Sequence, residues 1–269
     1  MLKKLRSQGG MTLVEVLLAV LLTGIISAAM FRVYINQHQA YNVQDNVIEM
    51  QQNARAAIDE LTRQIRMSGY ALPNGLSAFD AFDTDPDTIR IYYKTVSCEA
   101  PIEHDMPLPS AELRCDGHDV SCFYDGQIAY IYDPNLESGE FFEISHVQTG
   151  SAHIQHNTDV LSRVYPAGSQ LMAIEMIKYY IDQSDADHPR LMVQFSNETP
   201  QIYAEDIEDL QFTYVLKNGI TVDEPVLKAD VRQIGIELKA RTPRADIESG
   251  NIYRYRTYQS KVYLRNLGS

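Results

Sequence analysis

The chain of 269 residues lacks tryptophan, and its longest run of basic residues is the pair Lys3-Lys4. Its formal net charge is −13, and the residues beyond the short basic start (Lys3, Lys4 and Arg6) carry about −16. A chain this acidic repels nucleic acid and anionic lipid headgroups unless a basic patch overrides its field. The composition therefore argues against a nucleic-acid partner, and the length predicts one hydrophobic core.

Common catalytic and cofactor motifs are also missing, since G-x-S-x-G, P-loop, G-x-G-x-x-G and H-E-x-x-H patterns do not occur. The stretch Asp83-x-Asp85-x-Asp87 begins like a calcium loop. However, Thr88 replaces the glycine of the sharp turn, and Lys94 replaces the bidentate carboxylate, which excludes an EF-hand. A looser calcium site stays open beside a solvated acidic loop. We expect no enzyme, no cofactor and no bound metal.

A long apolar segment follows the basic start. Residues 11–31 are 21 residues with one charge, Glu15, and as a helix they span about 31 Å, against about 30 Å of bilayer hydrocarbon. The basic residues before the segment predict a cytoplasmic N-terminus and an exported chain from residue 36 onward. A cleaved secretory signal is the alternative, because Ser27-Ala28-Ala29 offers small residues for a peptidase, but the early carboxylate makes a poor signal core.

The helical pattern continues beyond the apolar segment and becomes amphipathic. Gly69 and Pro73 then provide a stop signal, so one helix is predicted over residues 11–68, with a membrane-spanning half (11–35) and an amphipathic half (36–69). The apolar stripe should pack on the following domain, while charged residues occupy the opposite face. The stripe consists of Val47, Gln51, Ala54, Ile58, Leu61 and Ile65, and the opposite face of Asp45, Glu49, Gln52, Asp59, Arg63 and Arg66.

Residues 70–269 are predicted to form a β-rich domain, because tyrosine, isoleucine and valine recur there in short runs separated by turn signals. Residues 77–87 are expected to be a polar connector, and residues 185–189 a hairpin loop. The fold class is therefore α+β: a long N-terminal helix packed on an antiparallel β-rich domain. The predicted strands cover residues 88–95, 127–132, 140–146, 152–155, 170–181, 190–195, 231–239 and 252–264.

Three cysteines, Cys98, Cys115 and Cys122, lie in the predicted exported domain. Together with His118 they could be drawn as a zinc site, but outside the cytoplasm cysteines more often oxidise, so we expect one disulfide among the three. The sequence leaves the pairing open. His153 and His156 point to opposite faces of a predicted strand, which makes a poor metal pair and favours surface histidines.

The N-terminus also resembles a known signal. A short basic leader, then Gly10, then Met11-Thr12-Leu13-Val14-Glu15 at the head of an apolar helix is similar to the type IV prepilin signal. That resemblance implies cleavage after Gly10 by prepilin peptidase, which removes residues 1–10, and N-methylation of Met11. Met11 replaces the usual Phe, and because residues 11–40 contain no proline, the kink of many major pilins is not predicted.

Three further stretches resemble the PilW-like minor pilins: residues 61–70, 207–214 and 263–267. This resemblance implies low-copy incorporation into a type IV pilus or its tip complex. The implied partners are other major and minor pilins, prepilin peptidase and the inner-membrane assembly platform. The implied location is the inner membrane, with the C-terminal domain in the periplasm, and then the pilus surface.

The resemblance also implies a role for Glu15, namely pairing with the new α-amino group of Met11 in a neighbouring subunit. A helix-dipole contact within one chain is the alternative. Two other functions stay open. A J-like pseudopilin of type II secretion would share the leader, helix and sheet, and a filament-displayed adhesin would need an exposed ligand patch. A DNA-uptake receptor would need clustered basic residues, which the chain does not have.

Overall fold

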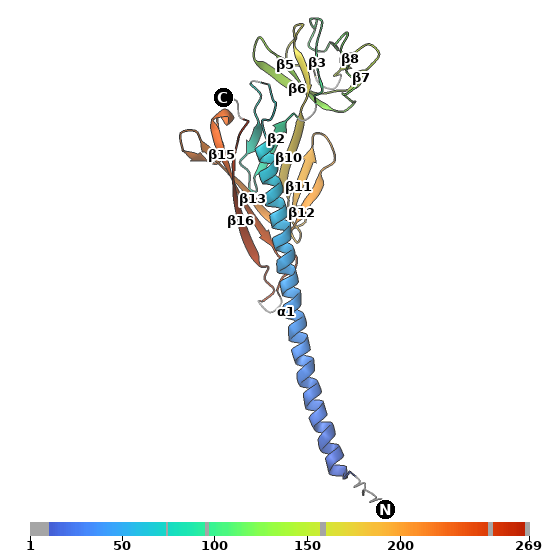
Figure 1. Ribbon diagram of the computed structural model, residues 1–269, viewed down its shortest axis with the longest axis vertical. Coiled ribbons are helices and arrows are strands. Elements are labelled where there is room, and N and C mark those ends of the chain that lie inside the picture. Colours follow the sequence, from blue (N-terminus) through green and yellow to red (C-terminus); the bar gives the residue numbers. More distant parts are fainter. Residues whose placement is uncertain (1–10, 74, 95–96, 157–159, 247–249, 267–269) are drawn as a thin grey trace, which may run out of the picture. The chain divides into compact units, whose positions relative to one another are not determined.

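The computed structural model describes residues 11–73, 75–94, 97–156, 160–246 and 250–266. Helix α1 (Leu13–Met67) is followed by antiparallel strands throughout, so the predicted fold class is confirmed (Figure 1). The chain forms two compact units, Met1–Ile48 and Glu49–Ser269, which are described separately below. The first unit contains only α1 among its described residues, and all the strands belong to the second.

The boundaries of α1 lie within two residues of the predicted ones. At its end the hydroxyl of Ser68 donates to the carbonyl of Ile65 at 2.7 Å, and Gly69 takes a φ of +78°, a conformation that favours glycine. Asn266, near the C-terminus, donates through its side-chain amide to the carbonyl of Ser68 at 3.3 Å. The C-terminal residues therefore help to satisfy the last carbonyls of the helix.

Within the second unit, α1 buries one face, as predicted. Ala54, Leu61 and Ile65 of the predicted stripe are fully buried. Three further buried residues, Met50, Ala57 and Gln64, were not part of that stripe. The charged residues Asp59, Arg63 and Arg66 are exposed, as expected for the opposite face.

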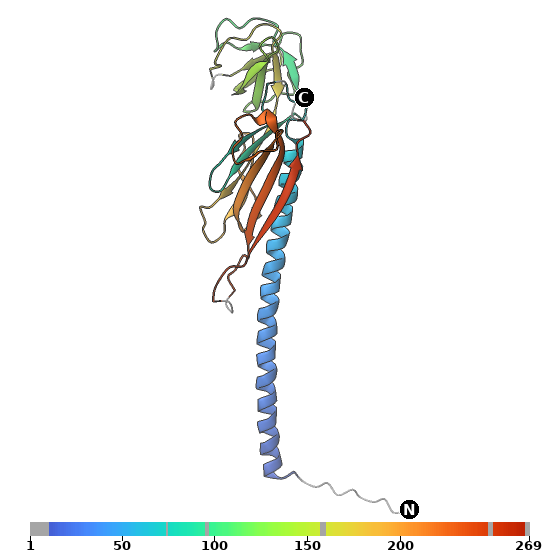
Figure 2. The same ribbon diagram turned by 90° about the vertical axis from the view of Figure 1, so that its left-hand side faces the viewer.

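Two antiparallel sheets pack around this part of α1 (Figures 1 and 2). Phe79 stacks on Tyr214 with ring centroids 5.6 Å apart and joins the two sheets, while the hydroxyls of Thr62 on α1 and Ser260 lie 3.1 Å apart. The five-stranded sheet has the order β1 (Phe79–Phe82), β2 (Thr88–Tyr93), β10 (Glu175–Asp182), β11 (Arg190–Phe195) and β12 (Gln201–Glu205). The four-stranded sheet has the order β14 (Thr221–Val222), β13 (Ile207–Leu216), β15 (Val231–Arg241) and β16 (Tyr255–Tyr263).

Strands β3 to β9 form an inserted lobe between the neighbouring strands β2 and β10. The lobe has its own cluster of buried residues, which includes Leu113, Phe142, Ile154 and Leu171. The expectation of one core is therefore wrong. One sheet of the lobe has the order β3 (Glu99–Pro101), β9 (Gln170–Ala173), β5 (Ile128–Asp133) and β6 (Ser138–Glu143). The other has the order β4 (Leu113–Arg114), β8 (His153–Gln155) and β7 (His146–Gln148).

The strand predictions missed β1, β3, β4, β12, β13 and β14. Strand β1 lies inside the predicted polar connector. Strand β13 was missed although its buried residues Leu210, Phe212 and Tyr214 alternate with more exposed ones, and only Ile207 falls outside this alternation, at a register shift before Asp209. Two of the predicted strands each correspond to two strands in the structure. Residues 140–146 contain parts of β6 and β7, and residues 170–181 contain β9 and most of β10. The predicted hairpin between β10 and β11 is present.

Candidate assembly site at the N-terminal end of helix α1

Glu15 lies in the first turn of α1, where its carboxylate is held by Thr12. The backbone N–H and the hydroxyl of Thr12 both donate to Oε2 of Glu15, at 2.9 and 3.0 Å. In return the backbone N–H of Glu15 donates to the hydroxyl oxygen of Thr12 at 3.3 Å. This reciprocal pattern is a capping box, which satisfies backbone donors that the first turn otherwise leaves unpaired.

Thr12 is the residue that the sequence interpretation missed. The spacing Thr12-x-x-Glu15 before an apolar run is itself the sequence signal of a capping box. The within-chain alternative for Glu15 is therefore realised in this single chain. An ionised carboxylate has about four acceptor sites, and both bonds from Thr12 use Oε2, so acceptor capacity is left for a further donor. Met11, next to the cap, is 70% exposed, and Gly10 lies outside the described residues.

Between Leu13 and Phe31, helix α1 presents mainly apolar side chains to its surroundings. No charged residue occurs between Glu15 and Arg32, and α1 is long and apolar enough to cross a membrane, with none of its most apolar window buried. An apolar surface of this size requires a bilayer or other apolar helices around it. The large apolar residues that are more than half exposed include Leu13, Leu17, Leu18, Val20, Leu21, Ile25, Ile26, Met30 and Phe31.

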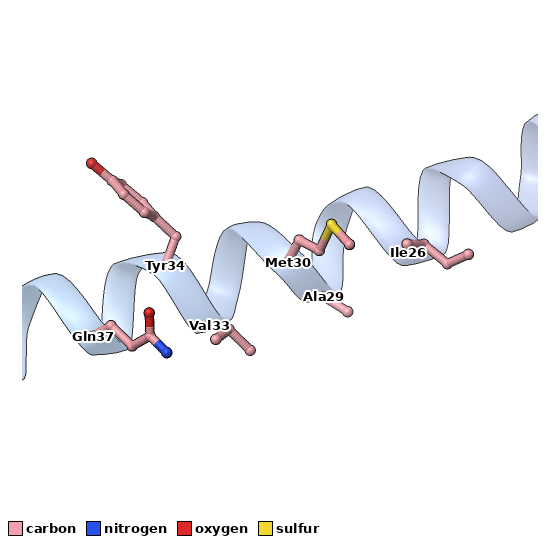
Figure 3. A pocket seen from close by; sticks show the side chains of 6 residues that line it. All are labelled: Ile26, Ala29, Met30, Val33, Tyr34 and Gln37. Carbon is pink, nitrogen blue, oxygen red and sulfur yellow. The ribbon is translucent and has the colours of Figure 1, made fainter.

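A shallow groove lies on this surface (Figure 3). Figure 3 shows its lining in two rows: Met30 and Tyr34 lie on one side of the helix, and on the other lie Ile26, Ala29, Val33 and Gln37. The ring of Tyr34 meets that of His38 edge-on, with centroids 6.1 Å apart. The groove is suited to accept an apolar side chain of another helix or a lipid chain.

The structure pairs Cys98 with Cys122, with their Cα atoms 5.7 Å apart, in agreement with the expectation of one disulfide. Cys115 is a free thiol, fully buried in the core of the inserted lobe. Burial, together with the nearby carboxylates of Asp116 and Glu103, raises the pKa of Cys115 to about 12. A thiol with so high a pKa is neutral at physiological pH and is a poor nucleophile.

The residues considered for metal binding have other partners. The Nε2 atom of His118 lies 2.8 Å from Oε1 of Glu103 and does not join the cysteines. Asp87 accepts the backbone N–H groups of Thr84 and Phe212, at 3.1 and 2.7 Å, and burial raises its pKa. Within the described ranges, no three His, Cys, Asp or Glu side chains are grouped so that they could hold a metal ion.

The histidine prediction is only partly correct. His153 lies partly exposed, with Asp116 3.0 Å from its Nε2 atom. His156 is buried, and its Nε2 atom lies 2.7 Å from the carbonyl oxygen of Ala111, so the expectation of a surface residue is wrong here. Strand β8 ends at Gln155, so the alternation of a strand does not extend to His156, and the sequence could not show that Ala111 would lie against it.

Residues 5–31 match the family described as the prokaryotic N-terminal methylation motif. The matched stretch contains Gly10, Met11, Thr12 and Glu15 together with most of the apolar segment. No curated protein matches the chain. The motif supports a type IV pilin-like or pseudopilin-type subunit, a class that is generally structural and not enzymatic, and it implies processing by prepilin peptidase and assembly with other pilins.

Proposed function

We propose that the chain is a PilW-like minor pilin of a type IV pilus, a structural subunit that contributes to pilus assembly or to the complex at the pilus tip. The observation that carries this proposal is the methylation motif over residues 5–31, which includes the start of an apolar helix with exposed side chains. A β-rich domain follows this helix in the chain. The finer assignment to minor pilins rests on the resemblance of residues 61–70, 207–214 and 263–267.

The proposal divides the chain by the task of each part. Residues 1–10 are a leader that prepilin peptidase removes after Gly10, and Met11 is then N-methylated. Residues 11–35 anchor the protein in the inner membrane and later pack among the helices of the filament. Residues 36–69 connect the anchor to the exported domain, residues 70–269, which lies in the periplasm and then on the filament.

Glu15 is the assembly carboxylate in this proposal. Transfer of the helix from the membrane into a bundle of apolar helices removes water from the carboxylate, and a desolvated carboxylate needs a cation or several donors. Cleavage creates an α-amino cation at Met11, and in a filament the amine of a neighbouring subunit can reach the acceptor sites that Thr12 leaves open. The capping box keeps the carboxylate at the helix start, where that amine arrives.

The test is N-terminal sequencing and intact-mass measurement of the protein from membranes. The proposal expects a chain that starts at Met11 and carries one extra methyl group. A start at Met30 would mean cleavage as a secretory signal and would contradict the proposal. To separate a pilus subunit from a J-like pseudopilin of type II secretion, the gene would be deleted: loss of pili with intact protein secretion supports the minor pilin, and the reverse result supports the pseudopilin.

A further inference from the structure

Strand β16 (Tyr255–Tyr263) is the outermost strand of the four-stranded sheet and pairs on one side only, with β15 (Figure 1). Its nine residues extend about 30 Å. The other edge strands among the described residues are shorter: β4 and β14 have two residues, β3 and β7 three, β1 four, β12 five and β6 six. Strand β16 is therefore the longest unpaired sheet edge in the described part of the chain.

The backbone along this edge has no partner in the described residues beyond those on the β15 side. The backbone bonds that flank the strand, from Thr242 to Arg254 and from Leu264 to Arg232, also run towards β15 and the segments next to it. In an antiparallel strand every second residue directs its N–H and C=O away from its partner. These groups can form a further ladder with another extended chain.

Strand β16 also lacks most of the devices that protect sheet edges. It contains no proline, and its register with β15 runs without a shift from Gln233 opposite Tyr263 to Arg241 opposite Tyr255. The contact between Ser260 and Thr62 fixes the strand against α1. The edge therefore has no bulge and is held in place before any partner arrives, which lowers the entropic cost of binding.

The charge around β16 is opposite in sign to that of the whole chain. Residues 251–266 contain four basic residues, Arg254, Arg256, Lys261 and Arg265, and no acidic residue, in a chain of net charge −13. Arg254 is paired with Asp246 at 2.5 Å, and Arg256 lies 5.5 Å from the ring centre of Tyr258. Lys261 is exposed and forms no ion pair with a described residue. Cations at the edge favour an acidic strand opposite them.

We propose that the free edge of β16 binds an extended, acidic segment of another pilin-like subunit, which adds to the four-stranded sheet as a fifth strand. A second copy of β16 is a poor partner, because the two strands would bring only like charges together. Nucleic acid is also disfavoured, because the chain as a whole is acidic and a phosphate backbone cannot use alternating donors and acceptors. That the partner belongs to the same filament rests on the proposed function.

The test is site-specific photo-crosslinking of the full chain in cells. The photo-reactive residue p-benzoylphenylalanine replaces Thr257 or Gln259, both exposed on β16, and in the control it replaces Thr221, exposed on β14 at the opposite edge of the same sheet. We expect crosslinks from both β16 positions to one acidic segment of one polypeptide, with attachment points that shift by two residues between them. Absence of crosslinks, attachment to nucleic acid, an unshifted attachment point, or equal yield from Thr221 would overturn the proposal.

A charge reversal tests the electrostatic part. Lys261→Glu should lower the crosslink yield from Thr257 about three- to tenfold, because it replaces an attraction by a repulsion. The matched control is Lys217→Glu, an exposed lysine on the turn after β13, which makes the same change in net charge and should leave the yield unaltered. Equal yields in the two variants would overturn the charge argument, provided that both are exported and resist protease equally.

The same samples separate this inference from the proposed function. A chain that starts at methylated Met11 and co-purifies with pilins, but gives no shifted crosslinks, would refute strand addition at β16 and leave the minor-pilin assignment intact. A chain that starts elsewhere would refute the assignment, whatever β16 binds.

Discussion

The hydroxyl of Tyr179, in the middle of β10, donates a hydrogen bond of 3.1 Å to the carboxylate of Glu60 on α1, 119 residues earlier in the chain. Gln64 donates to the same oxygen at 2.8 Å, and Arg63 to the other at 2.5 Å. The side chain of Glu60 is only 10% exposed. A largely buried carboxylate needs hydrogen-bond donors, and of these bonds the one from Tyr179 ties this face of α1 to the five-stranded sheet.

The fragment Gln39–Ser269 should be soluble and folded without the membrane-spanning segment. Residues from Glu49 onward form one compact unit, and the acidic surface and the polar face of α1 need no bilayer. A cooperative thermal unfolding transition and a monomeric elution volume would agree with this prediction. If the fragment aggregated under all oxidising conditions, the buried stripe of α1 would need partner subunits.

Tyr179→Phe in that fragment should lower the free energy of unfolding at pH 7 by about 1.5–3 kcal/mol, the usual value for a hydrogen bond to a charged group. Urea titration measures the loss. The matched control is Tyr180→Phe, because the next tyrosine of β10 is partly exposed and lies on the opposite face of the strand from Tyr179. Equal losses in the two variants would refute the role of the Glu60 contact.

The contribution of Glu60 should depend on pH. Burial raises the pKa of Glu60, but the hydrogen bonds from Gln64 and Arg63 and the charge of Arg63 outweigh it, so the pKa lies below its ordinary value. A carboxylate with a lowered folded-state pKa stabilises the fold above its unfolded-state pKa, near 4.3, and this contribution is lost as the pH falls through the folded-state value. The difference between wild type and Tyr179→Phe should therefore shrink as the pH falls from the unfolded-state value through the lower folded-state value. A difference that stays constant over that range would contradict the assignment.

Removal of the disulfide by the double change Cys98→Ala and Cys122→Ala should lower the free energy of unfolding by about 3 kcal/mol, since the bridge closes a loop of sequence separation 24. Peptide mapping without reduction should link Cys98 to Cys122 and leave Cys115 unmodified by alkylating reagent until the protein is unfolded, because its thiol is buried with a pKa of about 12. Three thiols that react in native protein from the cell envelope would contradict the prediction.

Gly69→Ala should destabilise the protein more than Gly117→Ala. Both glycines have a φ near +80°, so both changes carry the same backbone cost of about 1 kcal/mol. A Cβ atom at Gly69 would also lie 2.7 Å from the carbonyl oxygen of Asn266, whereas one at Gly117 would meet nothing within 4 Å. The extra loss at Gly69 should be about 1–3 kcal/mol in thermal or urea unfolding. Equal losses would mean that the C-terminal segment moves aside freely.

Changes at the N-terminus should separate processing, capping and assembly. Gly10→Val should abolish processing, while Glu15→Ala and Glu15→Gln should leave the protein inserted and largely cleaved but impair its recruitment to other pilins. Thr12→Val is the matched control, because it removes the capping hydroxyl, worth about 1 kcal/mol, and keeps the carboxylate. Co-purification of each variant with pilins measures recruitment. Wild-type recruitment of Glu15→Ala would refute the role of Glu15 between subunits.

The helix could be predicted because its signals are local. An uninterrupted apolar run, a change to a 3.6-residue pattern and a stop at Gly69 each involve residues that are close in sequence. The capping box of Thr12 and Glu15 was equally local and could have been found from the sequence. The largely buried position of Glu60 could not be predicted, because a carboxylate next to an apolar stripe normally points to solvent. Its partner Tyr179 lies in β10, far away in the sequence.

The β domain could be predicted as a class but not in its connections. Three features depend on segments that are distant in sequence: the pairing of two of the three cysteines, the loop that covers His156, and the strand at the edge of the sheet. Strand β13 could have been found from the local alternation of Leu210, Phe212 and Tyr214, whereas the inserted lobe could not, because strands β2 and β10 pair across it. The sequence by itself therefore determined the long apolar helix, the methylation motif and the α+β class, whose causes are composition and short-range periodicity. The tertiary structure decided the two-lobed core, the disulfide and the open edge of β16, because strand pairing is set by long-range packing that no local pattern encodes.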